Sequence, residues 1–474
     1  MGLAVLHLHL HGLYRGRDLP LGHDADTGGQ TLYVHELAHT LAGTPGIDQV
    51  DVLTRIIVAP GLDGDYAHPD ERVTPGFRIR RLPFGPPAYL AKEQLWPHLD
   101  ELVERIEETF RRSARRPDWI HAHDADGGYV GARLQQRLGL PLVFTAHSLG
   151  REKRRRLLAA GHDPAELEQR YALSRRIAAE ELALARSTLV VTSTEHERLR
   201  QYAGYRSFRP EVARAIPPGV DAGLFHPPAG PGCEPALEAM IEPLLRQPTL
   251  PPLLALCRPD PRKNIGALVE AFGRSTQLRS RHNLVLALGA GGGASSDQGP
   301  STVAAEAITQ LCRYGLQGRV ALLQHLPRQR IPGLLRWAAA LGGVFVNPAL
   351  TEPFGLSLLE AAASGLPLVA TDDGGPREIL RRCDNGLLVD VRDTEALQRS
   401  LESALSDPLR WRRWSANGLV GVRCHYSWLA HGQAYLKAVR ERLRAAPPAL
   451  VAAGDQGGGV PLPLGWCALE AGIQ

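Results

Sequence analysis

The sequence lacks long hydrophobic runs, paired cysteines and a strong charge of either sign. In its 474 residues no stretch approaches the roughly 18 consecutive apolar residues that a membrane span needs. Its six cysteines are far apart and form no C-x-x-C pair, which predicts neither a zinc knuckle nor a disulfide framework and favours a reducing cytoplasm. The net charge is only +4, and no stripe of Lys and Arg alternates with aromatic residues. We therefore expect a cytoplasmic protein that binds neither membranes nor nucleic acid.

The composition and the two ends of the chain add three expectations. With 44% hydrophobic and 22% charged residues the chain is typical of globular proteins, and it is long enough for two or three domains. The opening residues MGLAVLHLHLHG have no basic leader and no small-residue cleavage site, so we expect no signal peptide. After Ala445 all periodicity is lost, and we expect 446–474 to be a flexible tail.

Short apolar runs alternate with amphipathic stretches along most of the chain. The runs lie at 3–10, 50–57, 77–82, 119–122, 142–146 and 189–192, then at 253–257, 284–288, 320–323, 343–346, 367–370 and 387–389, with helical patterns between them such as 95–110 and 395–405. Apolar strands separated by helices are typical of parallel sheets buried on both faces. A proline-rich stretch, 215–252, divides the two series. We predict an α/β fold with two doubly wound, Rossmann-like domains, 1–217 and 218–425, that face a cleft.

In doubly wound sheets ligands bind beyond the carboxyl ends of the strands, so the loops after strands are the places to look for chemistry. The first such loop contains HDADTGGQT, residues 23–31, and places Gly28 and Gly29 at or near a helix N-terminus. Glycines there let backbone N–H groups approach a ligand, and the helix end favours an anion. Taken alone, the segment is explained equally well as a tight turn.

A second loop begins at His147, which ends the strand LVFTA and opens HSLGREK. We expect this histidine to point into the cleft, because a histidine of the core more often lies in the middle of a strand. Ser148, Lys153 and Arg176 follow within reach. The run 154–156 is expected to be a solvated helix face, whereas the loop context favours Lys153 and Arg176 as ligands of a phosphate.

The second domain has two further loops of this kind. Arg258 ends the strand LLALC and Lys263 precedes the next helix, so the two cations could form a clamp suited to a diphosphate. Taken by themselves, they are better explained as two surface cations. In NPALTEPFGLSLLEAAASG, Glu352 lies in the loop after a strand and Glu360 on the following helix. Two carboxylates at one cleft can bind the vicinal hydroxyls of a sugar and of a ribose.

Two motifs are rejected. GAGGGASSDQG, from Gly289, imitates a dinucleotide fingerprint, but no helix follows it at once, so a flexible loop is expected there. The alternating histidines of HLHLH, 7–11, have no carboxylate or cysteine set to complete a metal site, and only His11 is expected near a ligand.

Together these segments resemble the sucrose-phosphate synthase branch of the retaining glycosyltransferases of family 4, which have the GT-B fold. The resemblance covers residues 3 to 440 and is carried by HGLYRGRDLPLGHDADTGGQTLYVHELA, PFGPPAYLAKEQLWPHL, HSLGREK, RRIAAEE, RPDPRKN and NPALTEPFG. It implies transfer of glucose from UDP-glucose or another NDP-glucose to fructose 6-phosphate. YSWLAHGQAYLKAV resembles the C-terminal helix that crosses back onto the first domain in such proteins, and we expect this helix over 426–445.

The resemblance also implies roles for individual residues. On the donor side, Gly28 and Gly29 lie beside the phosphate, and Arg258 and Lys263 hold the diphosphate. The glucose hydroxyls and the pyrophosphate are bound by Glu352 together with Phe354, Gly355 and Leu356. Glu360 binds the ribose. On the acceptor side Gly29 and Gln30 lie beside the sugar, and Ser148, Lys153 and Arg176 hold its phosphate. His147 contacts the transferred sugar and, with Glu352, Arg258 and Lys263, makes up the expected catalytic set.

Two departures from the family pattern stand out. Plant relatives read R-D-K-Y where this chain has PPAY, so an acceptor-side lysine is replaced by Ala88, with Lys92 and Lys153 as candidates to compensate. Plant and some bacterial relatives also carry a phosphatase-like domain with a D-x-D-x-T motif, which is not found in this sequence. We therefore expect a separate phosphatase to act on the product.

The resemblance implies retention of configuration, and no carboxylate is an obvious covalent nucleophile, which favours front-face substitution. Arg258, Lys263 and helix-end amides then stabilise the leaving diphosphate. No metal cofactor is expected, with Mg²⁺ at most stimulatory, because two cations replace one divalent ion.

Three other functions stay open. They are a mannosylfructose-phosphate synthase that uses GDP-mannose, a sucrose synthase that uses free fructose, and a non-catalytic sugar-nucleotide sensor. Free fructose is disfavoured because Lys153 and Arg176 would have no phosphate to bind. A sensor should have lost a charge from the clamp or from the glutamate pair, and this chain has both. The base is expected to be recognised largely by backbone, around Gln324–Leu326.

Overall fold

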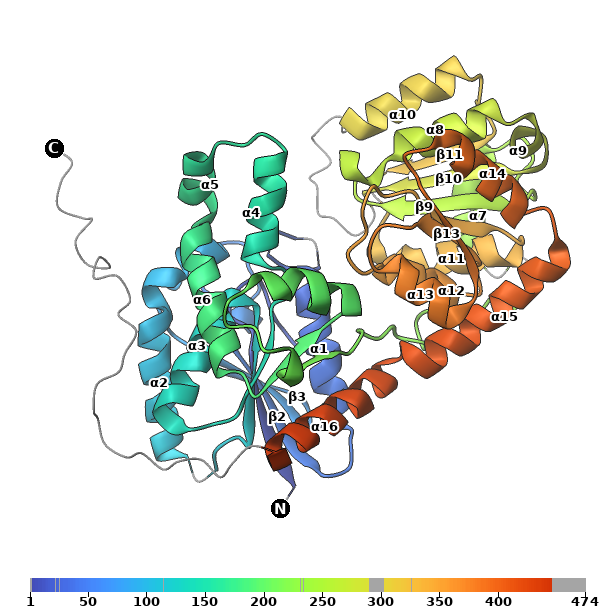
Figure 1. The fold of residues 1–474 in the computed structure, drawn as a ribbon. Coiled ribbons are helices and arrows are strands. Elements are labelled where there is room, and N and C mark those ends of the chain that lie inside the picture. Colours follow the sequence, from blue (N-terminus) through green and yellow to red (C-terminus); the bar gives the residue numbers. More distant parts are fainter. Residues whose placement is uncertain are drawn as a thin grey trace.

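The chain forms two lobes, each a sheet covered by helices (Figure 1). The structure, a computed structural model, describes residues 2–21, 23–24, 26–113, 115–230, 232, 234–289, 302–324 and 326–445. The expected tail, 446–474, and the glycine-rich loop from 290 onward lie outside these residues. The two parallel-rich α/β sheets confirm the predicted fold class.

The sheet of the first lobe has eight strands in the order β3-β4-β2-β1-β5-β6-β7-β8. The strands are β1 (Leu3–Leu8), β2 (Ile47–Arg55), β3 (Asp70–Thr74), β4 (Phe77–Leu82), β5 (Trp119–His123), β6 (Leu142–Thr145), β7 (Leu189–Thr192) and β8 (Ala213–Ala215). All neighbours pair in parallel except β3, which is antiparallel to β4. The central pair, β1 and β5, sets His7 opposite His121.

The second sheet has six strands, all paired in parallel, in the order β11-β10-β9-β12-β13-β14. They are β9 (Pro252–Cys257), β10 (Asn283–Leu288), β11 (Val320–Gln324), β12 (Val344–Asn347), β13 (Leu368–Thr371) and β14 (Gly386–Val389). The strand order reverses beside β9, next to β12. In such sheets this reversal is where ligands bind.

Helices cover the sheets and join the lobes. The first lobe has α1 (Gly29–Ala42), α2 (Leu99–Arg112), α3 (Asp124–Leu138), α4 (Gly150–Ala159), α5 (Pro164–Tyr171) and α6 (Leu173–Arg186). The second has α7 (Pro235–Ile241), α8 (Ile265–Arg274), α9 (Thr276–Arg281), α10 (Thr302–Arg313), α11 (Ile331–Ala340), α12 (Leu356–Ala363), α13 (Pro376–Cys383) and α14 (Thr394–Ala404). Two long helices, α15 (Pro408–His425) and α16 (Trp428–Ala445), run from the second lobe to the first (Figure 1).

The start of α15 shows how local sequence sets these boundaries. Asp407 accepts hydrogen bonds from the N–H groups of Leu409 and Arg410, and Pro408 opens the helix. A carboxylate at the N-cap and a proline in the first turn are both favoured at helix starts. After α15 the chain turns at Tyr426, and α16 packs its apolar face against the first sheet. No helix among the described residues is long and apolar enough to cross a lipid bilayer.

All the strands predicted from apolar runs are present, with ends shifted by at most three residues. Two strands were not predicted. β3 has the sequence DERVT and is largely exposed at the sheet edge, and β8 has only three residues. Neither contains an apolar run, so the pattern used for the other strands could not find them.

Candidate active site

Carboxylates build the loop between β1 and α1. Asp24 accepts hydrogen bonds from the N–H groups of Asp26 and Thr27 and from the hydroxyl of Thr27, each at 2.8 Å. The Thr27 hydroxyl accepts in turn from the N–H of Leu13, also at 2.8 Å. Burial would raise the pKa of Asp24, but these hydrogen bonds lower it. Asp24 therefore fixes the shape of the loop that leads to the two glycines.

Gly28 and Gly29 lie at the start of α1 with open space around them. Gly28 caps the helix and Gly29 is its first residue, as predicted. No described heavy atom lies within 4 Å of where a Cβ would be on either glycine, and neither has a positive φ. Packing and backbone strain therefore do not require glycine here. The missing side chains leave the first N–H groups of α1 accessible to a ligand.

Asp26 joins this loop to Lys92. Its Oδ2 accepts a hydrogen bond from the N–H of Lys92 at 3.0 Å, and its Oδ1 lies 3.5 Å from the Lys92 ammonium. Gln30, in the first turn of α1, places Nε2 3.2 Å from Nδ1 of His9. The carbonyl of Ala88 accepts from Arg55 at 2.7 Å, which fixes the segment before Lys92. Lys92, one of the two lysines expected to compensate for Ala88, is therefore held beside the glycine loop.

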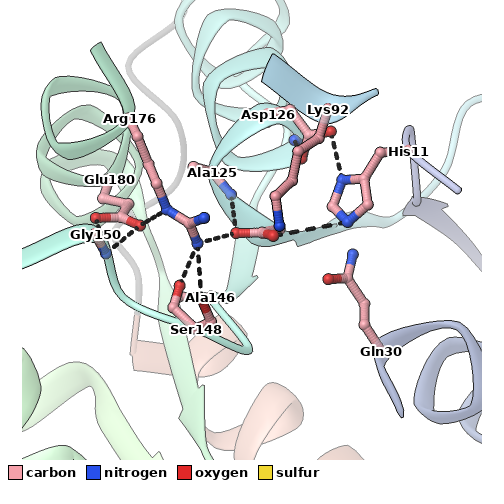
Figure 2. A network of polar contacts seen from close by, with 12 residues as sticks. His11, Gln30, Lys92, Ala125, Asp126, Ala146, Ser148, Gly150, Arg176 and Glu180 are labelled. Carbon is pink, nitrogen blue, oxygen red and sulfur yellow. Dashed lines mark hydrogen bonds and ion pairs between the residues drawn. The ribbon is translucent and has the colours of Figure 1, made fainter. Parts of the chain in front are cut away.

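A buried cluster of charges lies behind the loop (Figure 2). His11 places Nδ1 2.8 Å from Asp126 and Nε2 3.7 Å from Asp124. Arg176 places Nη2 2.6 Å from Asp124 and Nε 3.0 Å from Glu180. Burial favours the neutral form of His11, but the two aspartates outweigh it and raise its pKa to about 9. Burial likewise opposes the charge of Asp124, but Arg176 and His11 lower its pKa to about 2, so both groups are ionised at neutral pH.

Arg176 is largely occupied by these internal contacts. Its Nη2 also donates to the carbonyl of Ser148 at 2.5 Å and lies 3.2 Å from the Ser148 hydroxyl (Figure 2). Only Nη1 has no hydrogen-bond partner in the part of the chain that the structure describes. The role expected for Arg176 at an acceptor phosphate stays a prediction, and it depends on Nη1. The contacts that are present show a second role, which is to fix the loop that carries Ser148.

A pocket opens beside this cluster. It is lined by Lys92, Glu93, Trp96, Asp124, Ala125, Asp126, Tyr171 and Arg176. Lys153 lies at the same place, with Nζ 3.6 Å from the centre of the Tyr171 ring. Burial, and then the charges of Lys92 and Arg176, lower the pKa of Lys153 to about 8. A cation that its neighbours destabilise in this way is suited to receive an anion.

His147 follows β6 in a left-handed conformation, with φ of 53°, which is uncommon for a residue other than glycine. Its Nε2 lies 3.0 Å from Nδ1 of His123, and its ring packs edge-on against Tyr33 at 4.9 Å. Burial lowers the pKa of His147 to about 4, so the ring is neutral at physiological pH. Nδ1 has no hydrogen-bond partner among the described residues and is the atom left for a ligand.

Three buried histidines come together under His147. One ring nitrogen of each of His7, His121 and His123 lies within 4.8 Å of the others, which is the kind of group that could hold a metal ion. The sequence analysis considered the histidines of β1 alone and did not foresee that the register with β5 would bring His121 and His123 beside His7. Two of the nitrogens already bond one another, His7 Nδ1 to His123 Nε2 at 2.9 Å.

In the second lobe the predicted donor residues gather at the end of β9 and β12. Lys263 places Nζ 2.7 Å from Glu352, which also accepts from Asn347 at 3.2 Å. The side chain of Arg258 is exposed and forms no ion pair or hydrogen bond with another described residue, and only the carbonyl of Arg258 accepts, from the N–H of Asp260 at 2.8 Å. The clamp therefore consists of one cation paired with Glu352 and one cation that is available to a ligand.

Two glycines hold the Glu352 loop in place. The N–H of Glu352 donates to Asp373, and its carbonyl accepts from Gly375 at 2.9 Å. A Cβ at Gly374 would lie 2.2 Å from the Glu352 carbonyl oxygen, and one at Gly375 would lie 2.3 Å from that of Phe354. Packing thus requires both glycines, in contrast to Gly28 and Gly29. The pair lies at a helix start, since Gly375 caps α13.

Gly355, with φ of 103°, caps α12, and Leu356 is the first residue of the helix. Glu360 lies one turn further on, as predicted, with its carboxylate 3.8 Å from Arg328. Burial raises the pKa of Glu360 to about 7, against the opposing charge of Arg328. A carboxylate that is poorly solvated and weakly paired gains from accepting hydrogen bonds of a ligand.

The predicted residues thus form two groups, one in each lobe, and no hydrogen bond or ion pair between described residues joins the two groups. Gln30, His147, Ser148, Lys153 and Arg176 belong to the first group, and Arg258, Lys263, Glu352, Phe354, Gly355 and Glu360 to the second. The lobes do touch nearby. Glu378 of α13 accepts hydrogen bonds from the N–H groups of Glu195 and His196, at 2.8 and 3.2 Å.

The sequence analysis missed Asp124, Asp126 and Glu180, which organise the first group. The sequence did contain a signal for the two aspartates. The motif HDAD, which opens the glycine loop at 23–26, occurs again at 123–126, directly after a predicted strand. Glu180 had no such signal. It lies within RRIAAEE, which was examined for its arginines alone.

Comparison with known proteins agrees with this arrangement. The family model "Glycosyltransferase Family 4" matches residues 27–224, and the model "Glycosyl transferases group 1" matches residues 238–419. Each model covers one of the two lobes.

Curated relatives include a probable sucrose-phosphate synthase 2 from Arabidopsis thaliana, 38% identical over 92% of this chain and 47% of that protein. A probable sucrose-phosphate synthase from Solanum tuberosum has the same identity and the same coverage of both chains. The chain therefore spans about half the length of the curated relatives it matches.

Solved structures show the same architecture over the full length of the neighbour. Sucrose-phosphate synthase from Thermosynechococcus elongatus is 26% identical, with a TM-score of 0.69, and the match covers 94% of this chain and 100% of that one. Anabaena HepE in complex with UDP-glucose shares the fold at 18% identity, with a TM-score of 0.60 over 93% of this chain and 100% of that chain. The chain thus has the GT-B fold, each of its lobes matches a glycosyltransferase family model, and it is similar to curated sucrose-phosphate synthases over about half of their length.

Proposed function

We propose that this chain transfers glucose from UDP-glucose, or another NDP-glucose, to fructose 6-phosphate with retention of configuration, which gives sucrose 6-phosphate and the nucleoside diphosphate. The observation that carries the proposal is the pocket of the first lobe, where Lys92, Lys153 and Arg176 gather beside the glycine loop. Relatives named sucrose-phosphate synthase support the choice of acceptor.

The acceptor phosphate binds in this pocket, with Lys153 as its principal ligand. Lys153 forms no ion pair with a described carboxylate, whereas Lys92 is shared with Asp26 and Arg176 with Asp124 and Glu180. A phosphate dianion would restore the favourable electrostatics that Lys153 lacks in the free protein. Ser148 is exposed at the same place and supplies a hydroxyl, and Gln30 and Gly29 contact the sugar.

The donor binds to the second lobe. Arg258 and Lys263 hold the diphosphate, and the N–H groups at the start of α12, after Gly355, add a helix end that favours an anion. Glu352 binds glucose hydroxyls, with Lys263 and Asn347 orienting its carboxylate. Glu360 accepts hydrogen bonds from the ribose.

In the reaction the bond from the anomeric carbon to the diphosphate oxygen breaks, and the fructosyl hydroxyl attacks from the same face. Its proton passes to the departing oxygen. Charge grows on the diphosphate in the transition state, and Arg258 and Lys263 stabilise it there. Because these two cations supply that charge, no metal cofactor is required, and EDTA should leave the rate unchanged. Closure of the lobes would exclude water from the donor.

The product retains a phosphate, so a separate phosphatase of the same compartment would complete the synthesis of sucrose. We place both steps in the cytoplasm, where Cys257, Cys312, Cys383 and Cys424, which are free thiols in the structure, would remain reduced.

The test is incubation of the purified chain with UDP-glucose and fructose 6-phosphate, in which UDP release and the anomeric proton signal of the product are followed together. We expect equimolar UDP and an α-glucosyl product, and little turnover with free fructose. UDP release without a new glycoside would mean hydrolysis of the donor, and no turnover with UDP-, ADP- or GDP-sugars would favour a sensor. Activity that is highest with GDP-mannose would assign the chain to the mannosyl enzymes instead.

A further inference from the structure

Three imidazoles lie in a hydrogen-bonded row that ends at His147. His7 Nδ1 lies 2.9 Å from His123 Nε2, and His123 Nδ1 lies 3.0 Å from His147 Nε2. His7 lies on β1, His123 ends β5 and His147 follows β6, so the row crosses three neighbouring strands. His7 and His123 are fully buried. His147 is only partly buried, and its Nδ1 has no hydrogen-bond partner among the described residues, so this atom can meet a ligand.

All three rings are neutral at physiological pH, because burial lowers the pKa of His7 to about 3 and that of His147 to about 4, and lowers that of His123 as well. A neutral imidazole carries one proton and one lone pair. The row therefore has only two consistent arrangements. In the first, His7 donates to His123 and His123 donates to His147, which leaves the His147 proton on Nδ1. In the second, every bond runs the other way, and the His147 proton is on Nε2.

The inner end of the row distinguishes the two arrangements. His7 Nε2 is buried and has no hydrogen-bond partner among the described residues. In the first arrangement this atom is an unused lone pair, and in the second it is an unpaired N–H. Buried N–H groups without an acceptor are the rarer of the two in proteins, since each non-bonded donor retains its full desolvation cost. The first arrangement is therefore the more stable one.

We propose that His7 and His123 are positioning residues that hold His147 in the tautomer with its proton on Nδ1, so that His147 acts as a hydrogen-bond donor to an oxygen of the bound sugar. The identity of that sugar rests on the proposed function, whereas the tautomer does not. A histidine in water favours the proton on Nε2, so without the row His147 would present a lone pair instead of an N–H.

Histidine-selective ¹⁵N labelling and long-range ¹H–¹⁵N correlation spectra test this directly, because protonated and unprotonated ring nitrogens differ strongly in chemical shift. The His147 signals are identified by their loss in His147→Gln. In the otherwise unmodified protein we expect a protonated Nδ1 and an unprotonated Nε2. A protonated Nε2 on His147 would overturn the proposal, and this outcome requires no variant to fold.

Two substitutions at His123 then separate positioning from support of the fold. His123→Leu removes the donor to His147, and we expect the His147 proton to move to Nε2 and kcat/KM for the nucleotide sugar to fall about tenfold, the effect of one hydrogen bond. His123→Gln retains an N–H donor. Its kcat/KM should stay within about threefold of the parent, which is the effect expected when one hydrogen bond is weakened but not lost. Equal losses in both variants would contradict the proposal.

His121→Leu is the matched control. His121 is as buried as His123 and its ring lies beside it, with centroids 4.0 Å apart, but its Nε2 bonds Thr145 and not His147. This variant should leave the His147 tautomer unchanged. If the parent protein shows the Nδ1–H tautomer but transfers no sugar, the proposed function fails and the tautomer assignment stands.

Discussion

At the scale of single residues, whether a cation is paired with a carboxylate decides whether its removal mainly lowers stability or ligand affinity. Arg176 and Lys263 are paired with carboxylates, whereas Arg258 and Lys153 form no ion pair with a described residue. Removing a paired, buried cation leaves its partner unsatisfied and mainly costs stability. Removing an unpaired one mainly costs ligand affinity. The two unpaired cations are therefore the more informative sites for mutation.

The first prediction concerns Arg258. Arg258→Ala should weaken UDP-glucose binding and lower kcat, because a charge-assisted hydrogen bond of ~1.5–3 kcal/mol is lost and the charge on the leaving group grows in the transition state. Arg262→Ala is the control, since Arg262 is an exposed neighbour that pairs with Asp260. Steady-state kinetics with varied UDP-glucose measures both effects. Unchanged kcat in Arg258→Ala would remove this residue from the mechanism.

The second prediction is a pH dependence that arises from Lys153, whose pKa is about 8 in the free protein. Phosphate binding favours the charged amine, so KM for fructose 6-phosphate should rise as the pH passes above 8, by up to about tenfold per unit. The sugar phosphate itself is already a dianion in this range. The side chain introduced by Lys153→Arg keeps its charge to higher pH. The KM of this variant should therefore stay flat from about one unit below that pKa to about one unit above it, at about pH 7 to 9. Identical profiles for the two proteins would mean that Lys153 does not touch the phosphate.

Sequence and structure agree best at this scale for residues in the loop that comes after a strand. The placement of His147, Arg258 and Glu352 in such loops was predicted, because the end of an apolar run marks where a loop begins. Asp124 was not identified as an organiser of the site, because its importance depends on a contact with Arg176 of α6, which is 52 residues away. Glu180 is only four residues from Arg176 on the same helix, but it also accepts a hydrogen bond from the N–H of Gly150 on α4. Contacts between separate elements of this kind are set by tertiary packing and are invisible in a pattern.

At the scale of elements, the same reasoning explains which strands could be predicted. Central strands are buried on both faces and read as apolar runs, whereas β3 alternates exposed and half-buried residues at the sheet edge. The histidine of β1 is a second limit. His7 is a buried polar residue within this strand, and only the register with β5 shows what it contacts. Helix starts were easier to predict, since glycine, proline and aspartate mark them locally.

The third prediction separates glycines that serve packing from glycines that serve a ligand. Gly29→Ala meets no described atom within 4 Å and has no positive φ, so the melting temperature should change by no more than a few degrees. If donor and acceptor pass over this position, transfer should nevertheless be lost. Calorimetric titration should still show UDP binding, because the nucleotide contacts belong to the second lobe.

Gly64→Ala is the matched control for this experiment. Gly64 also has open space around it and no positive φ, but it lies in a short 3₁₀ helix, Gly64–Ala67, and not in the glycine loop. Both the turnover and the stability of this variant should resemble those of the parent. If Gly29→Ala also transfers glucose at the parent rate, the glycines only form a turn. Loss of UDP binding in Gly29→Ala would mean that the assignment of the nucleotide to the second lobe is wrong.

At the scale of the whole molecule, the end of the described chain completes the core of its beginning. Trp428, Tyr435, Leu436 and Val439 of α16 belong to the same buried cluster as residues of β1, β2 and α1. The indole N–H of Trp119 donates to the Tyr435 hydroxyl at 2.9 Å. His431 places Nδ1 2.8 Å from the carbonyl of Pro217, in the segment between the two sheets, and the Tyr33 hydroxyl bonds its Nε2 at 3.1 Å. The first lobe thus cannot complete its core until the second lobe has been synthesised.

The last prediction tests this dependence. Tyr435→Ala removes a fully buried ring and leaves the Trp119 N–H without its acceptor, which should cost about 3–5 kcal/mol. For a lobe of this size that corresponds to a fall of about 6–20 °C in its melting temperature, at roughly 2–4 °C per kcal/mol. Differential scanning calorimetry with and without UDP should assign the effect, because UDP stabilises the lobe that binds it. We expect the UDP-insensitive transition to move and the UDP-sensitive one to stay. Leu429→Ala, on the same helix but 63% exposed, should move neither, and equal shifts in both transitions would mean that the lobes unfold as one unit.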